Sequence, residues 1–171
     1  IGPAYEDKVG RRAIRMLARG ARAVAVAFAQ TAEHPALRGA ATRVTGMPLR
    51  PALERAARAA SPRPRGGTPR LLVMGGRGGA RALNELLPQA VAELHRRGVH
   101  VEVLHLTGRG DPASVERAYR DAGITAHVTA FREDMDAVWP SIDAAVCRAG
   151  ASTCAELVAF AVPALLVPFP A

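Results

Sequence analysis

The stretch AAVCRAGASTCAE, residues 144–156, decides the fold of this chain. The apolar run at 142–146 predicts a buried strand, and the small residues at 148–151 predict a tight turn. A helical pattern then opens at Ser152 and carries Glu156 one turn into the helix. A strand, a tight turn and a helix in this order aim the unpaired N–H groups of the helix N-terminus at whatever lies above the strand.

Two interpretations of this helix start are open on the sequence pattern alone. The first is an anion site, because the positive end of the helix dipole and the unpaired N–H groups favour a phosphate. The second is a capping box, in which Thr153 and Glu156 satisfy the helix end with their own side chains. A ligand that recruits Glu156 and a capping role in the empty protein are compatible with each other.

Strands alternate with helices along the rest of the chain. The expected strands are residues 22–28, 42–45, 70–74, 100–106, 125–131, 142–146 and 164–167, and the expected helices are 5–19, 51–60, 80–97, 112–122, 133–139 and 152–160. This order predicts an α/β fold with a parallel sheet covered by helices on both faces. Ligands bind such sheets at the carboxyl ends of the strands, where Gly75–Gly79, the turn after Phe131 and Arg148–Ser152 all fall.

The glycine loop GGRGGA at residues 75–80 follows a strand and precedes a helix, so a dinucleotide site has to be considered. Such a site needs an acidic residue at the end of the next strand to hold a ribose. That strand instead ends near His105 and Leu106, and Glu102 lies inside it. The loop GxxxxGK[ST] of ATPases and GTPases is also missing from the sequence. A tight strand-to-helix turn remains an equally good explanation of these glycines.

The composition narrows the class of partner. The 171 residues suit one domain or parts of two, and the formal net charge is +8, with Lys8 as the single lysine. This charge permits a phosphate-bearing substrate or an anionic membrane surface. Nucleic acid is not expected, because the arginines are dispersed and aromatic residues make up only 4%. A basic amphipathic helix at residues 5–19 either lies on a membrane or packs with a solvated basic face.

The cysteine, histidine and hydropathy patterns argue against a disulfide, a metal site, a membrane span and a signal peptide. Cys147 and Cys154 are expected to be reduced, as in a cytoplasmic protein, and no metal site is expected because the five histidines lack ligand spacing. No apolar run reaches the roughly 18 residues of a membrane span, and no signal-peptide pattern is present. Both ends of the chain look cut, which predicts a fragment.

Six motifs in order resemble one family. They are TGMPLR (45–50), LLVMGGRGGARALNELLP (71–88), LHLTGRGD (104–111), FREDM (131–135), CRAGASTCAE (147–156) and VPALLVPFP (162–170). Together they resemble glycosyltransferase family 28, whose members have the GT-B architecture of two Rossmann-like domains with the active site in the cleft. The resemblance implies that residues 1–46 are the end of the acceptor domain. Residues 47–69 would be a hinge, a short helix and a linker, and 70–171 an incomplete donor domain.

The resemblance also implies a site for a UDP-sugar. Arg50 would lie near the donor, the loop with Gly76, Arg77 and Gly78 would face the diphosphate, and the backbone at Arg132 would read the uracil. The α-phosphate would meet Gly150, Ala151, Ser152 and Thr153, and Glu156 would accept hydrogen bonds from the ribose. One helical turn, ~5.4 Å, suits the offset from phosphate to ribose.

Three departures from the family pattern bear on this site. Arg77 and Gly78 replace a usual Ser-Gln pair, and Arg77 would supply a charge-assisted contact in place of the serine hydroxyl. Arg132 stands where isoleucine is usual, a change that a backbone contact tolerates. No residue of this chain is assigned as the catalytic general base.

The activity implied is an inverting transfer of N-acetylglucosamine from UDP-N-acetylglucosamine to lipid-linked N-acetylmuramyl-pentapeptide in peptidoglycan synthesis. The donor is a substrate, and no cofactor is implied. The acceptor would bind through a missing N-terminal region, at the inner face of the bacterial cell membrane. The alternatives are a non-catalytic nucleotide-sugar-binding module and a family 28 transferase with another sugar or acceptor.

Overall fold

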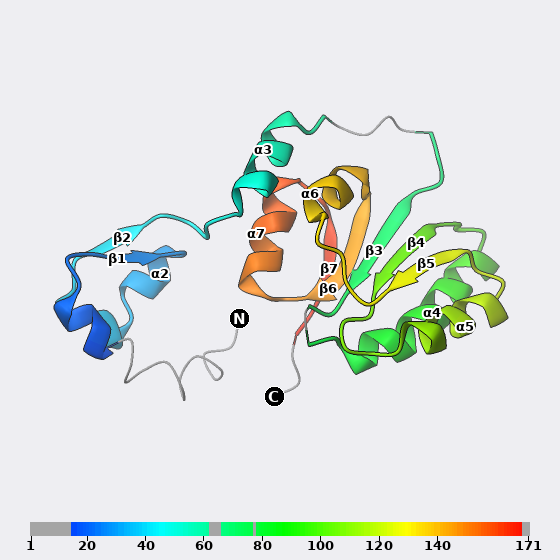
Figure 1. Ribbon diagram of the computed structural model, residues 1–171, viewed down its shortest axis with the longest axis horizontal. Coiled ribbons are helices and arrows are strands. Elements are labelled where there is room, and N and C mark those ends of the chain that lie inside the picture. Colours follow the sequence, from blue (N-terminus) through cyan, green and yellow to red (C-terminus); the bar gives the residue numbers. More distant parts are fainter. Residues whose placement is uncertain (1–14, 62–65, 77, 169–171) are drawn as a thin grey trace. The chain divides into compact units, whose positions relative to one another are not determined.

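The computed structural model describes residues 15–61, 66–76 and 78–168 (Figure 1). These residues divide into two compact units, with the boundary between Pro48 and Leu49. The smaller unit comprises the described residues up to Pro48, and the larger one begins at Leu49. Each unit has its own buried cluster, and each is described by itself.

The smaller unit is built around a short parallel pair of strands. β1 (Val24–Val26) pairs with β2 (Thr42–Val44), so both predicted strands are present but shorter than expected. Residues 15–20 are helical, in agreement with the end of the predicted amphipathic helix. The short helix α2 (Ala29–Ala32) and the 3-10 turn η1 (Pro35–Leu37) were not predicted. Its small core is formed by Ala18, Val26 and Leu37.

The larger unit contains a five-stranded, wholly parallel sheet. Its order is β5 (Ala126–Thr129), β4 (Glu102–Leu106), β3 (Arg70–Met74), β6 (Ala144–Arg148) and β7 (Ala164–Val167). Leu72 in the central strand pairs in register with Leu104 and with Ala145. All carboxyl ends therefore lie at one edge of the sheet, as the sequence predicted.

Helices cover both faces of this sheet (Figure 1). One core cluster joins α4 (Arg81–Arg96) and α5 (Pro112–Asp121) to the face that carries Val73. The other joins α3 (Pro51–Ala59), α6 (Met135–Val138) and α7 (Ala151–Ala159) to the face that carries Leu72. Leu72 and Val73 are both completely buried, as expected for successive residues of a strand packed on both sides.

Helix α3 lies in the segment that the sequence grouped with the linker, but it packs in the core of the larger unit. Its Leu53 is 1% exposed and belongs to the same cluster as Leu157 of α7. The proline at its first position explains its start, because a proline there loses no helical hydrogen bond.

The predicted helix at 133–139 is shorter than expected and is followed by the 3-10 turn η2 (Trp139–Ser141). Pro140 explains the change, because it has no N–H to continue the α-helical hydrogen bonds. The Trp139 ring in this tight turn is 1% exposed and belongs to the core cluster that contains Leu72. Within the described residues, no helix combines the length and apolar character needed to cross a bilayer.

Candidate functional site

Four loops meet the carboxyl edge of the sheet. They follow β3 at residues 75–76 and 78–80, β4 at 107–111, β5 at 130–134 and β6 at 149–150. This is the edge at which parallel α/β sheets bind ligands. The three loops predicted from the sequence therefore lie at the same edge, and the loop after β4 is a fourth one there.

The loops after β3 and β4 are packed backbone against backbone. Gly79 has φ +74° and donates its N–H to the carbonyl of Gly76 at 2.9 Å. A Cβ atom added to Gly79 would lie 2.7 Å from the carbonyl oxygen of Thr107. One added to Gly108 would lie 2.4 Å from the Cα of Gly79. Glycine is required at both positions, because any side chain would push the two loops apart.

A buried polar network lies under these loops. His105 is completely buried, and its Nε2 and Nδ1 lie 3.1 Å from the Asn84 side-chain oxygen and the Tyr119 hydroxyl, respectively. The Asn84 amide nitrogen donates to the carbonyl of Thr107 at 3.2 Å. Nε2 therefore carries the imidazole proton, and Nδ1 accepts from Tyr119. Sequence reasoning classed the histidines as structural or surface residues and did not identify this network.

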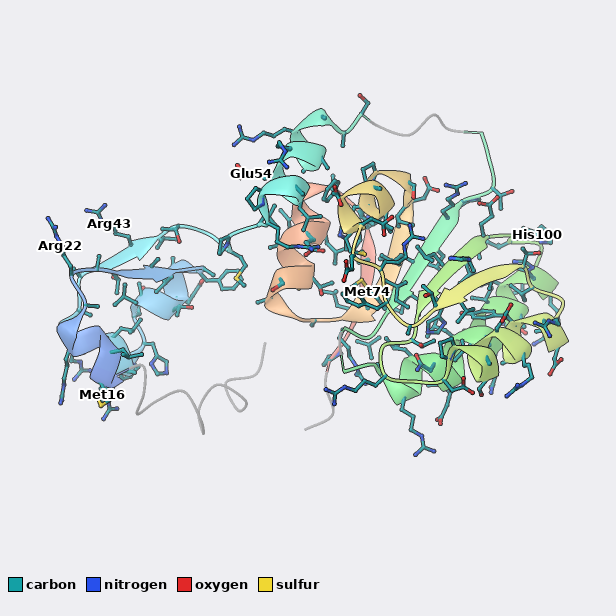
Figure 2. All side chains as sticks on the ribbon, in the orientation of Figure 1. Met16, Arg22, Arg43, Glu54, Met74 and His100 are labelled. Carbon is teal, nitrogen blue, oxygen red and sulfur yellow. The ribbon has the colours of Figure 1, made fainter. Side chains whose placement is uncertain are left out.

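Burial has a clear electrostatic effect on the network. It lowers the pKa of His105 to about 4 and raises the pKa of Tyr119 above its usual range, since burial disfavours both charged forms. The imidazole is therefore neutral at physiological pH and acts as a fixed hydrogen-bonding link between α4, β4 and α5. His100, which the sequence placed on the same strand, instead precedes it, at the amino end of β4 (Figure 2).

The turn after β6 leads directly into the N-terminus of helix α7. Helix α7 begins at Ala151, one residue earlier than predicted, with Gly150 as the N-cap. The N–H groups of Ala151, Ser152 and Thr153 are those of the first turn, which have no carbonyl acceptor within the helix. Gly150 places its carbonyl to accept from Cys154 at 2.9 Å, so the turn closes without using these three N–H groups.

The capping-box interpretation of Thr153 and Glu156 is wrong. Thr153 is the third residue of the helix rather than its N-cap, so its side chain has passed the capping position. The Glu156 carboxylate instead accepts a hydrogen bond of 2.7 Å from the indole Nε1 of Trp139. Sequence reasoning missed Trp139, although it is the single tryptophan of the chain and stands next to a helix-ending proline.

The two arginines among the described candidate residues have different surroundings. Arg132 turns its guanidinium to Asp134 in its own loop, with Nε 2.7 Å from Oδ1, and thereby holds the pKa of that exposed carboxyl below its usual range. Arg50 is exposed at the N-cap of α3. Arg77 lies outside the described residues, and its neighbour Gly78 is exposed.

Two hollows lie at this edge. An open groove of about 580 Å³ runs between α4 and α5 from Gly78 to Ser114, and one of about 350 Å³ lies between Gly108 and Phe131. Glu156 lines neither of these two hollows. Across the described ranges, no group of three His, Cys, Asp or Glu residues is placed to hold a metal ion.

A parallel sheet with glycine loops and a helix N-terminus at its carboxyl edge defines a Rossmann-like domain suited to phosphate-bearing ligands. Residues 70–171 match the glycosyltransferase family 28 C-terminal domain. The chain belongs to this family, as the resemblance implied.

Named relatives agree with this assignment. A UDP-N-acetylglucosamine--N-acetylmuramyl-(pentapeptide) pyrophosphoryl-undecaprenol N-acetylglucosamine transferase of Sorangium cellulosum is 44% identical over 147 residues, covering 85% of this chain and 35% of the relative. An enzyme of the same name from Anaeromyxobacter sp. is 41% identical over 158 residues, covering 92% and 40%.

A solved structure supports the fold. The crystal structure of MurG from Acinetobacter baumannii matches with a TM-score of 0.64 and 30% identity, covering 91% of this chain and 42% of that one. The predicted α/β fold with helices on both faces of a parallel sheet is confirmed. The chain spans about two fifths or less of the length of these relatives.

Proposed function

We propose that this chain binds the UDP-sugar donor of a transferase that moves N-acetylglucosamine from UDP-N-acetylglucosamine to lipid-linked N-acetylmuramyl-pentapeptide. The observation that carries the proposal is the start of α7. Its first-turn N–H groups face the sheet edge, and the carboxylate of Glu156 is held one turn further along. A phosphate at the helix N-terminus and a ribose beside Glu156 fit this spacing, which is about 6 Å along the helix axis from Ser152 to Glu156.

Each part of the donor has a proposed partner. The α-phosphate lies at Gly150, Ala151, Ser152 and Thr153, and the ribose hydroxyls donate to Glu156. The loop with Gly76, Arg77 and Gly78 faces the diphosphate, Arg50 lies near it, and the backbone at Arg132 contacts the uracil. The packing of the loop after β3 against that after β4 supports this arrangement, because it fixes the backbone that would face the diphosphate.

In the proposed reaction, the 4-hydroxyl of the acceptor forms a bond to C1 of the sugar, and the bond from C1 to the UDP oxygen breaks with inversion. The hydroxyl proton passes to a base that we do not assign to this chain. Stabilising the negative charge that develops on the diphosphate is the task of the donor side, through fixed N–H dipoles. The donor is a substrate, and the proposal involves no metal and no resident cofactor.

The domain roles follow the same proposal. Residues 1–46 would end the acceptor domain, 47–69 would connect the domains, and 70–171 would bind the donor. We place the protein on the cytoplasmic face of the membrane, where its lipid-linked acceptor is anchored. The exposed side chains of Arg22 and Arg43, which point away from the strands of the smaller unit, support contact with an anionic surface (Figure 2).

Calorimetric titration of the full chain with UDP, UDP-N-acetylglucosamine and ADP tests the donor assignment. We expect both uridine nucleotides to bind, with the sugar nucleotide at least as tight as UDP, and ADP to bind at least 10-fold more weakly. No heat from either uridine nucleotide on the folded chain would overturn the proposal. Equal affinity for ADP would replace it with a general phosphate site.

The substitution Glu156→Gln should weaken UDP binding about 10-fold, roughly 1.4 kcal/mol, because a neutral amide accepts hydrogen bonds less strongly than a carboxylate. The amide oxygen can still accept from Trp139, so the thermal midpoint should stay close to that of the parent chain. Glu102→Gln is the matched control, because Glu102 pairs with Arg70 at the amino end of the sheet. Equal UDP affinity in both variants would remove Glu156 from the site.

A further inference from the structure

The indole of Trp139 makes a short hydrogen bond to the residue that we assign to the ribose. Nε1 of Trp139 donates to Oε2 of Glu156 at 2.7 Å, across 17 positions of sequence. A hydrogen bond of this length from an N–H group to a carboxylate is charge-assisted and roughly twice as strong as one between neutral groups. The contact therefore contributes to the orientation of the carboxylate and is more than a packing neighbour.

The indole itself is fixed by its surroundings. Trp139 is 1% exposed, belongs to the core cluster that includes Leu53 and Leu157, and stacks on Phe160 with ring centroids 6.2 Å apart and an interplanar angle of 19°. An indole has one N–H donor and no acceptor, so this ring has one polar contact to make, and it makes it to Glu156. Because the ring is buried and stacked, the direction of its N–H is fixed by the core of the domain.

The bond changes what Glu156 can do. The side chain of a glutamate has three rotatable bonds, so ordering it costs conformational entropy. Anchoring one oxygen on a rigid donor removes most of that cost before a ligand arrives, which is how preorganised contacts gain affinity. Among the described residues, no hydrogen bond is found for the second oxygen, Oε1, on a carboxylate whose direction is already set.

We propose that Trp139 is a positioning residue that holds the Glu156 carboxylate in the orientation that selects a ribose with free hydroxyls. The inference rests on the proposed function, because it assigns Glu156 to the ribose of a uridine nucleotide. Trp139 itself touches no ligand in this arrangement. Its effect is confined to the part of the nucleotide that Glu156 contacts, which separates it from a merely structural core residue.

The test compares the affinities of UDP and 2′-deoxy-UDP by calorimetry for the full chain and four variants: Trp139→Phe, Glu156→Gln, the double variant and the control Phe160→Leu. For the parent chain we expect UDP to bind about 10-fold more tightly than 2′-deoxy-UDP, the loss typical of a site left with an unpaired polar group. Trp139→Phe keeps an aromatic ring and removes the N–H, and should reduce this preference to threefold or less by weakening UDP alone. The double variant Trp139→Phe/Glu156→Gln should show no further loss beyond Glu156→Gln.

Phe160→Leu is the matched control, since it disturbs the same ring stack and leaves the indole N–H in place. It should lower stability without changing the preference for UDP. An unchanged preference in Trp139→Phe, or an equal loss for both nucleotides, would overturn the positioning role. Absence of UDP binding to the parent chain would instead overturn the proposed function itself, and the positioning role with it.

A second measurement does not depend on how well a Trp139 variant folds. The chain has one tryptophan, so a ¹⁵N-labelled sample gives one indole N–H resonance. We expect this resonance to be shifted downfield by its carboxylate acceptor, to move upfield in Glu156→Gln, and to respond to UDP more strongly than to inorganic phosphate. An indole resonance that Glu156→Gln and UDP both leave in place would contradict the proposal.

Discussion

Replacing Gly108 with alanine is expected to destabilise the folded chain by about 3–5 kcal/mol, which is a large share of the stability of a domain of this size. The added Cβ atom would meet the Cα and N atoms of Gly79 at 2.4 Å. Both contacts are backbone, so no side chain can turn aside to make room. Gly108 also has φ +64°, a conformation that costs a residue with a Cβ roughly 1–2 kcal/mol.

The control separates the backbone conformation from the collision. Gly123 has a similar φ of +71°, and a Cβ atom there would meet nothing within 4 Å. Gly123→Ala should therefore cost only the roughly 1–2 kcal/mol of the left-handed conformation. Urea denaturation of both variants gives their losses in free energy of unfolding. Gly108→Ala should also lose UDP binding. Equal stability of the two variants would show that the two loops are not packed as described.

The second large effect is a loss of stability in mild acid. The pKa of His105 falls from 6.5 to about 4 on folding. Between these two pH values the unfolded chain binds a proton at His105 and the folded chain does not. The stability that His105 contributes is complete above pH 6.5 and is lost as the pH falls from 6.5 through about 4. The shift corresponds to at most about 3 kcal/mol.

Urea denaturation of the parent chain and of His105→Asn between neutral pH and about pH 4 isolates this contribution, because the carboxylates titrate in both proteins. The parent chain should lose more stability than the variant over this range. His127→Asn is the control, since His127 is exposed on β5. If the variant is too unstable to compare, the pKa of His105 can be measured from the pH dependence of its ring resonances in the NMR spectrum of the parent chain. A pKa near 6.5 would contradict the burial of this histidine.

Much of the fold could be predicted from local patterns. The apolar strands at 70–74 and 164–167 were located to the residue, because a buried parallel strand is a continuous apolar run between turn signals. The ends of helices were off by one or two residues, where capping geometry rather than hydropathy decides. The short α2 and η1 were missed, because a turn or two of helix has too few residues to show a period.

The loops of the candidate site were also predictable, because glycines after strands mark the carboxyl edge of the sheet. What the sequence could not supply was the pairing of side chains across distant segments. The side chains that meet in the Trp139–Glu156 contact and around His105 are 14 to 21 positions apart in the sequence. Pairings at such separations follow from the tertiary packing, so the capping box, a local alternative, looked equally good on the sequence.

The central claim is that a UDP-sugar binds at the start of α7 and at the glycine loop after β3. Mapping of backbone amide shifts during titration of the full chain with UDP-N-acetylglucosamine tests this claim most directly. We expect the largest shifts at Ala151, Ser152 and Thr153, with further shifts at Gly78 and Arg132. Shifts confined to the groove between α4 and α5, around Asn84 and Ser114, or no shifts at saturating nucleotide, would contradict it.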